Sequence, residues 1–291
     1  MNWRYEAENA RLRLDSFIQQ STQVGEERSG STFAGLKPGT VVEYSEPPCL
    51  RMIKESDGSQ EEVAVTVPGI FCDKTLPPVF GLRSHKFEHV RYLRQFVRLT
   101  GLGSNNFQDG LAGFSDIETE FQKYPEVTKL TGFDFGVYES EPCVALHARY
   151  LTERRLVRSQ RHIPFPPEID PNHALEDARD WQFIRAEDNA VQYAKKTVEK
   201  DGTVRIEPLR PEDFKEGDLV EATGAFVAYP SSKVGDTFRE AAQVKRKATM
   251  EEAQVKKPPR KKTKMPTAMN LKRAHISYGG VGGGRDTAMG E

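Results

Sequence analysis

Two stretches in the second half of the chain decide the fold: VQYAKKTVEKDGTVRIEP at 191–208 and LVEATGAFVAY at 219–229. The first holds two strand-like runs, 191–199 and 203–208, on either side of Asp201-Gly202. An Asp-Gly pair between such runs favours a β-hairpin, because both residues tolerate the positive φ of a tight turn. The second stretch is a long strand with Gly224 inside it, which is typical of a bulge or sharp bend.

Short strands and a few helices are predicted before these runs. The stretches 41–44, 50–53 and 63–67 are strand-like, and the last two are joined by a turn that carries Asp57-Gly58. The spacing of apolar residues predicts a helix over 84–98. The predicted fold class is α+β, with short, mostly antiparallel strands, and a small barrel or a sandwich is the architecture considered.

Changes in composition along the chain predict four segments. Residues 1–20 carry an apolar stripe at helical spacing and are predicted to form an amphipathic helix. Residues 21–35 are rich in Ser, Thr, Gly and charge, which indicates a linker. We expect an α+β globular body over 36–230 and a disordered basic tail over 231–291.

Composition narrows the class of protein. Of the 291 residues 37% are apolar and 29% are charged, and the mean hydropathy is −0.64. No stretch approaches the ~20 apolar residues of a membrane span, and no apolar signal core opens the chain. Cys49, Cys72 and Cys143 are too few and too scattered for a disulfide framework or a zinc knuckle. We expect a soluble, intracellular protein that is not secreted, with no membrane contact and no cofactor.

The net charge of −1 conceals a strong asymmetry. Residues 241–291 hold twelve of the 42 Lys and Arg but only four of the 43 Asp and Glu, so they carry +8 and the rest of the chain −9. Such a split indicates an interaction tail. Large apolar residues are scarce in this segment and prolines interrupt it, so the sequence predicts that it is disordered when alone.

Two basic clusters lie in this tail. Their spacing resembles a bipartite nuclear localisation signal, which an import receptor reads as an extended cationic strand. We therefore expect the nucleus, or otherwise the cytoplasm, as the location, and a nuclear-import receptor as a partner. The alternative is a tail that only increases solubility and binds no receptor. The clusters consist of Lys245, Arg246, Lys247, Lys256, Lys257, Arg260, Lys261, Lys262 and Lys264.

The same tail allows nucleic-acid contact of a limited kind. Its cations would neutralise phosphates and give weak, salt-sensitive affinity without sequence preference. Base stacking by the tail is not expected, because Tyr278 is its only aromatic residue after Phe238.

A metal-dependent hydrolase is the alternative function. His85, Glu88 and His89 satisfy the pattern H-x-x-E-H, which is found in one class of zinc peptidases. On a helix, the two histidines would share one face and reach the same metal ion, and Glu88 would polarise a water molecule. The competing interpretation is a surface helix with incidental histidines, and the surrounding arginines favour it because their field repels a divalent cation.

Arginines are frequent around this motif and later in the chain. They would either converge on an anion such as a phosphate backbone or pair with acidic residues of the body, and the second interpretation is favoured. The residues concerned are Arg83, Arg91, Arg94, Arg98, Arg149, Arg154, Arg155, Arg158 and Arg161.

The segment LRPEDFKEGDLVE at 209–221, which continues into FVAYP at 226–230, resembles part of a group of uncharacterised, lineage-restricted proteins of mushroom-forming fungi. The resemblance covers about twenty residues of the chain and implies no activity. Common enzyme motifs, such as a phosphate-binding loop or a nucleophile elbow, are absent from the sequence. The preferred interpretation is a non-enzymatic nuclear binding or scaffold protein, whose protein partner the sequence does not reveal.

Overall fold

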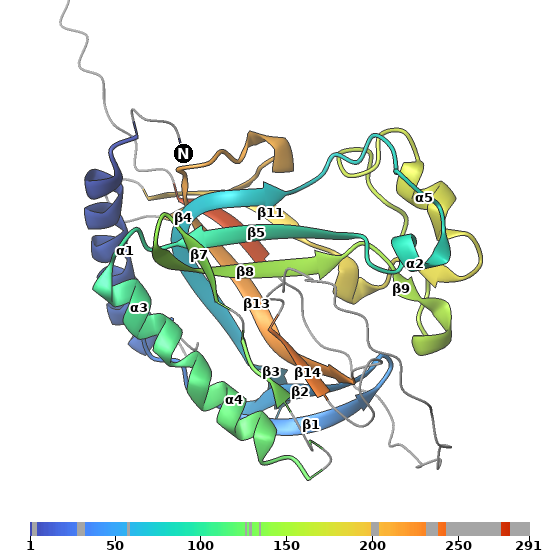
Figure 1. Cartoon of the computed structure of the whole chain (residues 1–291), viewed down its shortest axis with the longest axis horizontal. Coiled ribbons are helices and arrows are strands. Elements are labelled where there is room, and N and C mark those ends of the chain that lie inside the picture. Colours follow the sequence, from blue (N-terminus) through green and yellow to red (C-terminus); the bar gives the residue numbers. More distant parts are fainter. Residues whose placement is uncertain are drawn as a thin grey trace, which may run out of the picture.

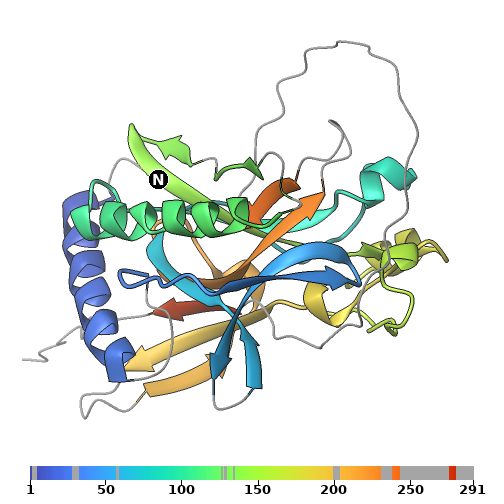
Figure 2. The same ribbon diagram turned by 90° about the horizontal axis from the view of Figure 1, so that it is seen from below.

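A curved sheet forms the centre of the computed structural model, with helices along one side and a lobe at one end (Figure 1). The model describes residues 1, 5–27, 33–56, 59–125, 127, 130–133, 135–198, 204–230, 238–242 and 275–279. Figure 2 shows two helices end to end along one face, with a third running roughly at right angles to them. These three helices are α3 (Asn105–Ala112), α4 (Phe114–Gln122) and α1 (Ala7–Glu27).

The sheet has an eight-stranded path, with further strands attached at its centre. Along the path the order is β12 (Val204–Pro208), β11 (Gln192–Val198), β15 (His275–Gly279), β13 (Leu219–Pro230), β4 (Ala64–Thr75), β5 (Arg94–Thr100), β8 (Glu141–Arg149) and β7 (Gly136–Tyr138). The attached strands are β1 (Thr40–Ser45), β2 (Pro48–Ser56), β3 (Ser59–Glu62), β14 (Phe238–Ala242) and β6 (Leu130–Thr131). All pairs are antiparallel except β11 with β15 and β14 with β6.

The lobe consists of residues 76–93 and 150–190 and is the part that carries the candidate site. It contains two short helices, one two-stranded sheet and two 3₁₀ turns. These elements are α2 (Phe87–Val90), α5 (Ala174–Arg179), β9 (Thr152–Glu153), β10 (Phe183–Ile184), η1 (Arg154–Leu156) and η2 (Glu187–Asn189). A third 3₁₀ turn, η3 (Pro211–Asp213), lies outside the lobe, before β13.

The two stretches that decide the fold behave largely as predicted. β11 and β12 pair antiparallel up to Val198 and Val204, although the Asp-Gly turn itself lies outside the described residues. β13 pairs with β4 as far as Ala225 and then with β2 at Val227 and Ala228. β13 therefore exchanges β4 for β2 just after Gly224. Its register with β4 is continuous, so there is no bulge at this glycine.

The α+β class with mostly antiparallel strands is confirmed. A closed barrel is wrong, because the path ends at β12 and β7, and these two strands do not pair with each other in the described part of the chain.

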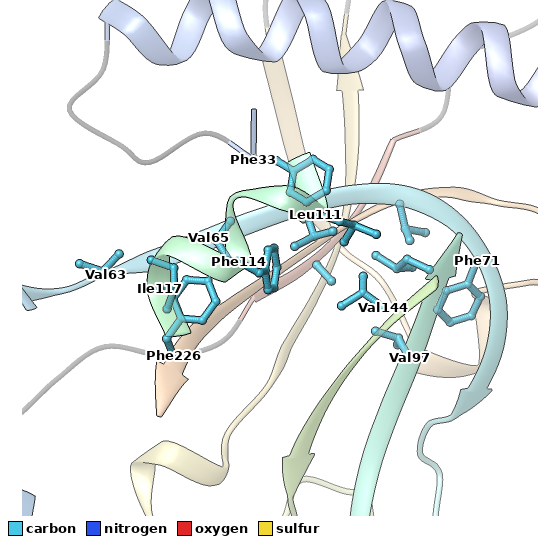
Figure 3. Close-up of a cluster of buried hydrophobic side chains, with 14 of the residues drawn as sticks. Phe33, Val63, Val65, Phe71, Val97, Leu111, Phe114, Ile117, Val144 and Phe226 are labelled. Atoms are coloured by element: carbon cyan, nitrogen blue, oxygen red, sulfur yellow. The ribbon is translucent and has the colours of Figure 1, made fainter. Parts of the chain in front are cut away.

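The main core lies between α3, α4 and the sheet. Figure 3 shows Phe114 and Phe226 close together, with Phe33 beside them and Val97 and Val144 further along the sheet. The Phe114 ring lies 5.3 Å from that of Phe226 and 6.4 Å from that of Phe33, in edge-on arrangements that aromatic rings prefer. All five residues are buried.

Segment boundaries differ from the prediction in two places. The N-terminal helix continues to Glu27, so the predicted linker at 21–35 begins as a helix and later contributes Phe33 to the core. The helix predicted over 84–98 is wrong, because only Phe87–Val90 is helical and Arg94–Thr100 is strand β5. Only the face of β5 that carries Gln95, Val97 and Leu99 is buried throughout, whereas Arg94 and Arg98 of the other face are half-buried. The apolar residues of α2, of the turn after it and of β5 follow one another closely and together imitate the apolar face of one helix.

Within the predicted tail at 231–291 the structure describes two strands, β14 and β15, and neither is predicted from the sequence. The other residues of that segment lie outside the described part, so the predicted disorder stays a prediction. No helix among the described residues is long and apolar enough to cross a membrane.

Candidate functional site

The H-x-x-E-H residues do not form a shared face of one helix. His85 precedes α2, whereas Glu88 and His89 lie within it, and all three side chains are exposed. Among the described residues, no group of three or more His, Cys, Asp and Glu side chains is placed to hold a metal ion. The geometry thus gives no support to the hydrolase alternative.

The nine cations of the two basic clusters all lie outside the described residues. The three cysteines are described, and all of them are free and buried. Burial raises the pKa of the Cys49 thiol to about 11, with the nearby Arg51 cation acting in the opposite direction.

Some of the arginines singled out in the sequence meet on one carboxylate in the lobe. Arg91 Nε lies 2.8 Å from Glu153 Oε1, and Arg155 Nε lies 2.5 Å from Glu153 Oε2. The Glu153 side chain is only 4% exposed, whereas that of Arg155 is 67% exposed. One buried carboxylate therefore holds two cations at the surface, so this centre carries a net positive charge.

Exposed aromatic residues adjoin this centre. The Arg91 guanidinium lies 5.6 Å from the ring centroid of Tyr92, which is 46% exposed. In addition, the Arg154 amide donates a 2.9 Å hydrogen bond to the Gln182 carbonyl, which places the backbone of Arg154 beside the residue that follows Trp181. Trp181 is 75% exposed. We call these five residues, Arg91, Tyr92, Arg154, Arg155 and Trp181, the arginine–aromatic patch.

Local structure explains why the patch is held in place. Phe183 of β10 pairs with Glu153 of β9, and the Phe183 ring packs 5.0 Å from that of Phe87 in α2. Because Phe183 is buried, this contact fixes α2 against the two-stranded sheet. Arg91, which follows α2, is thereby held next to β9, and Figure 1 shows α2 and β9 side by side in the lobe.

A second pair of cations lies where the lobe meets the main sheet. Arg94 and Arg149 are directly paired across β5 and β8, an arrangement that like charges normally disfavour. Burial, followed by the charge of Arg149, lowers the pKa of Arg94. The Arg149 guanidinium lies 5.3 Å from the ring centroid of Tyr229. Among the described residues, neither Arg94 nor Arg149 forms an ion pair with a carboxylate.

The lobe is fastened to the β1–β2 hairpin by buried and polar contacts. Glu46 accepts hydrogen bonds from the Ser159 amide, at 3.0 Å, and from the Ser159 hydroxyl. Arg51 of β2 forms ion pairs with Glu62 of β3, at 3.5 Å, and with Asp188 of η2. These contacts hold the 150–190 segment against the sheet, because they join residues far apart in the sequence.

A histidine–carboxylate pair ties the lobe's own segments together. His162 Nε2 lies 2.9 Å from Glu176 Oε1 of α5, while its Nδ1 accepts a 3.1 Å hydrogen bond from the Arg185 amide. Burial lowers the pKa of His162, and Glu176 opposes this effect. Because both ring nitrogens of His162 have partners, the ring joins α5 to the segment at Arg185, and its role is structural.

Of the arginines named from the sequence, the structure brings together Arg91 with Arg155, and Arg94 with Arg149, whereas Arg98 pairs with Asp73 at 3.0 Å. Arg91, Arg155 and Arg98 thus pair with acidic residues of the body, as the favoured interpretation expects, whereas convergence on an external anion stays a prediction. Sequence reasoning missed Trp181. A tryptophan between Asp180 and Gln182 was an available signal, because a large aromatic residue among polar neighbours is often exposed.

Comparison with known proteins adds no family: no family model and no curated protein matches the chain.

Proposed function

We propose that the chain is a non-enzymatic nuclear binding or scaffold protein, in which the basic tail is the import signal and the folded body is the binding part. The observation that carries this proposal is the separation of charge along the chain, with +8 on residues 241–291 and −9 on the remainder. A dense cationic segment that is separate from an acidic body is typical of an import signal, which binds to a receptor lined with carboxylates.

The tail also supports a weak, nonspecific contact with nucleic acid. Each Lys or Arg that neutralises a phosphate releases counterions, so such binding weakens steeply as salt concentration rises. The acidic charge of the body opposes a large phosphate-facing surface, which limits the contact to the tail and to local cationic areas of the body.

The body supports a binding role through the lobe. In its arginine–aromatic patch Trp181, Tyr92 and Arg155 are exposed, and these side chains belong to the types that contribute most to recognition. The lobe is fixed to the main sheet by Arg51 and Asp188. Such a surface is held in place by the fold and pays little ordering entropy on binding.

The test is the location of a fluorescent fusion in cells. We expect the intact chain in the nucleus, and we expect a variant with alanine in place of the second basic cluster to lose the nuclear signal. The substituted residues are Lys256, Lys257, Arg260, Lys261, Lys262 and Lys264.

A control variant carries alanine at three exposed cations of the body, Lys37, Lys195 and Arg205, and should stay nuclear. A cytoplasmic intact chain, or an equal loss of nuclear signal in the control variant, overturns the proposal.

A further inference from the structure

We propose that the arginine–aromatic patch of the lobe binds single-stranded nucleic acid, with the arginines on its phosphates and Trp181 stacked on a base. This inference names the partner of the body and in that respect rests on the proposed function. It locates the contact in the folded lobe, away from the tail.

The cations of the patch are positioned for a second anion. Arg91 and Arg155 both approach Glu153 through Nε, so their contact with this carboxylate does not depend on the terminal nitrogens of the guanidinium groups. Arg154, which opens η1 next to them, is exposed and has no ion-pair partner among the described residues. Three arginines against one buried carboxylate leave a local positive charge, which suits a row of phosphates.

The aromatic residues point to an unpaired strand. Trp181 and Tyr92 expose much of their surface, although burial of such rings is strongly favourable. Bases of a single strand stack on exposed aromatic side chains, and this stacking is tolerant of sequence because every base has a flat face. In a duplex, the bases are already stacked on one another, so an exposed tryptophan gains less from it.

An acidic protein segment would satisfy the arginines as well, so the exposed aromatic residues decide between the two partners. The carboxylates of an acidic segment would leave the exposed rings without a stacking partner, whereas a single strand supplies phosphates and flat bases together. Here Arg91 and Arg155 meet on Glu153, Tyr92 lies against Arg91, and Trp181 precedes the residue whose carbonyl accepts the hydrogen bond of the Arg154 amide. Cations flanked by stacking platforms are the arrangement of single-strand binding surfaces.

The experiment measures fluorescence anisotropy of labelled oligothymidylate with the full chain. All variants are made in a background where the six cations of the second basic cluster are alanine, so that the tail does not mask the lobe. We expect Trp181→Ala to weaken binding about tenfold, which equals about 1.4 kcal/mol and fits the loss of one stacked base. Trp181→Phe should retain most of the affinity.

The phosphate contact has its own readout. Arg155→Ala should reduce the slope of log affinity against log salt concentration by about 0.7, the value for one phosphate contact on a single strand. Arg155→Lys should keep the slope. Asp180, exposed beside Trp181, repels phosphate in this arrangement, so Asp180→Asn should tighten binding.

Two control variants lie away from the patch. Phe80→Ala removes another exposed aromatic residue of the lobe, and Arg205→Ala removes an exposed arginine of β12, and both should bind as the background does. Circular dichroism verifies that the variants are folded.

The proposal is overturned if Trp181→Ala and Arg155→Ala bind unchanged, or if the duplex of the same strand binds as tightly as the single strand. A polyglutamate peptide that binds with the same dependence on Trp181 would assign an acidic protein as partner instead. These measurements use purified protein and do not depend on import, so the patch and the nuclear address can fail separately.

Discussion

Arg51 and Glu62 form an ion pair with an N–O distance of 3.5 Å, although each side chain is only 6% exposed. They come from neighbouring strands, β2 and β3, and Asp188 of the lobe approaches the same guanidinium. Burial raises the pKa of Glu62 to about 7, the Arg51 charge acts against this shift, and the Asp188 charge adds to it. The junction between lobe and sheet therefore contains a carboxyl group that titrates near neutral pH.

The first prediction concerns the pH dependence of stability. Folded Glu62 keeps its proton up to a pH of about 7, whereas the unfolded chain releases it at about 4.5. The free energy of unfolding should therefore decrease as pH rises between these values, by up to about 3 kcal/mol, and level off above them. Urea denaturation of the wild type and of Glu62→Gln across this range isolates the effect, because the variant lacks it.

The neighbouring Glu61 provides the control for this measurement. Its side chain is 46% exposed, so Glu61→Gln should keep the pH dependence of the wild type. An identical pH profile in wild type and Glu62→Gln would show that Glu62 does not titrate in this range.

The second prediction concerns Arg51 itself. Above a pH of about 7, where Glu62 is ionised, Arg51→Ala leaves this carboxylate buried without its cation and releases Asp188, so it should destabilise the protein by about 3–5 kcal/mol. The double variant Arg51→Met with Glu62→Leu should recover much of this loss, because it replaces the buried pair by apolar groups of similar size. Equilibrium denaturation measures both, and a double variant no more stable than Arg51→Ala would contradict the explanation.

The parts of the fold that local sequence specifies were predicted well. The β11–β12 hairpin follows from two strand-like runs around an Asp-Gly pair, and β13 follows from one long run of β-formers. In both cases the residues that specify the strand lie next to one another in the sequence.

Features that depend on tertiary contacts were not predicted. Residues 94–98 of β5 were predicted as part of a helix because their apolar residues follow closely on those of α2, and periodicity cannot separate a short apolar strand from a helix segment. The centre of the candidate site depends on Glu153, which meets Arg91 from a distant part of the chain. No pattern within the sequence marks such a pair before the chain is folded.

The third prediction tests the aromatic core. Phe114 is 2% exposed, and its ring lies 5.0 Å from that of Phe133 and 5.3 Å from that of Phe226. Phe114→Ala should lower the free energy of unfolding by about 3–5 kcal/mol through lost burial and the cavity left behind. Phe80→Ala, at a position that is 66% exposed, should change it by less than about 0.5 kcal/mol, and both are measured by urea denaturation.

The fourth prediction concerns the contact between α3 and the segment after α1. Replacing a helical glycine by alanine normally stabilises a helix by about 1 kcal/mol. A Cβ at Gly110, however, would lie 2.2 Å from Phe33 Cε1. The Phe33 ring is packed against Phe107 at 5.4 Å and against Phe114, so it has no room to move away. Gly110→Ala should therefore destabilise the protein by about 1–3 kcal/mol.

A neighbouring glycine and a second substitution separate this steric effect from helix propensity. At Gly113 a Cβ would meet its nearest neighbour at 3.4 Å, an ordinary contact, so Gly113→Ala should be neutral or stabilising. In the Gly110→Ala background, Phe33→Leu should restore part of the stability, because the smaller side chain makes room for the methyl group. If Gly110→Ala is as well tolerated as Gly113→Ala in thermal denaturation, Phe33 does not pack on α3 in this way, and the region predicted as a linker at 21–35 does not contribute to the core as described.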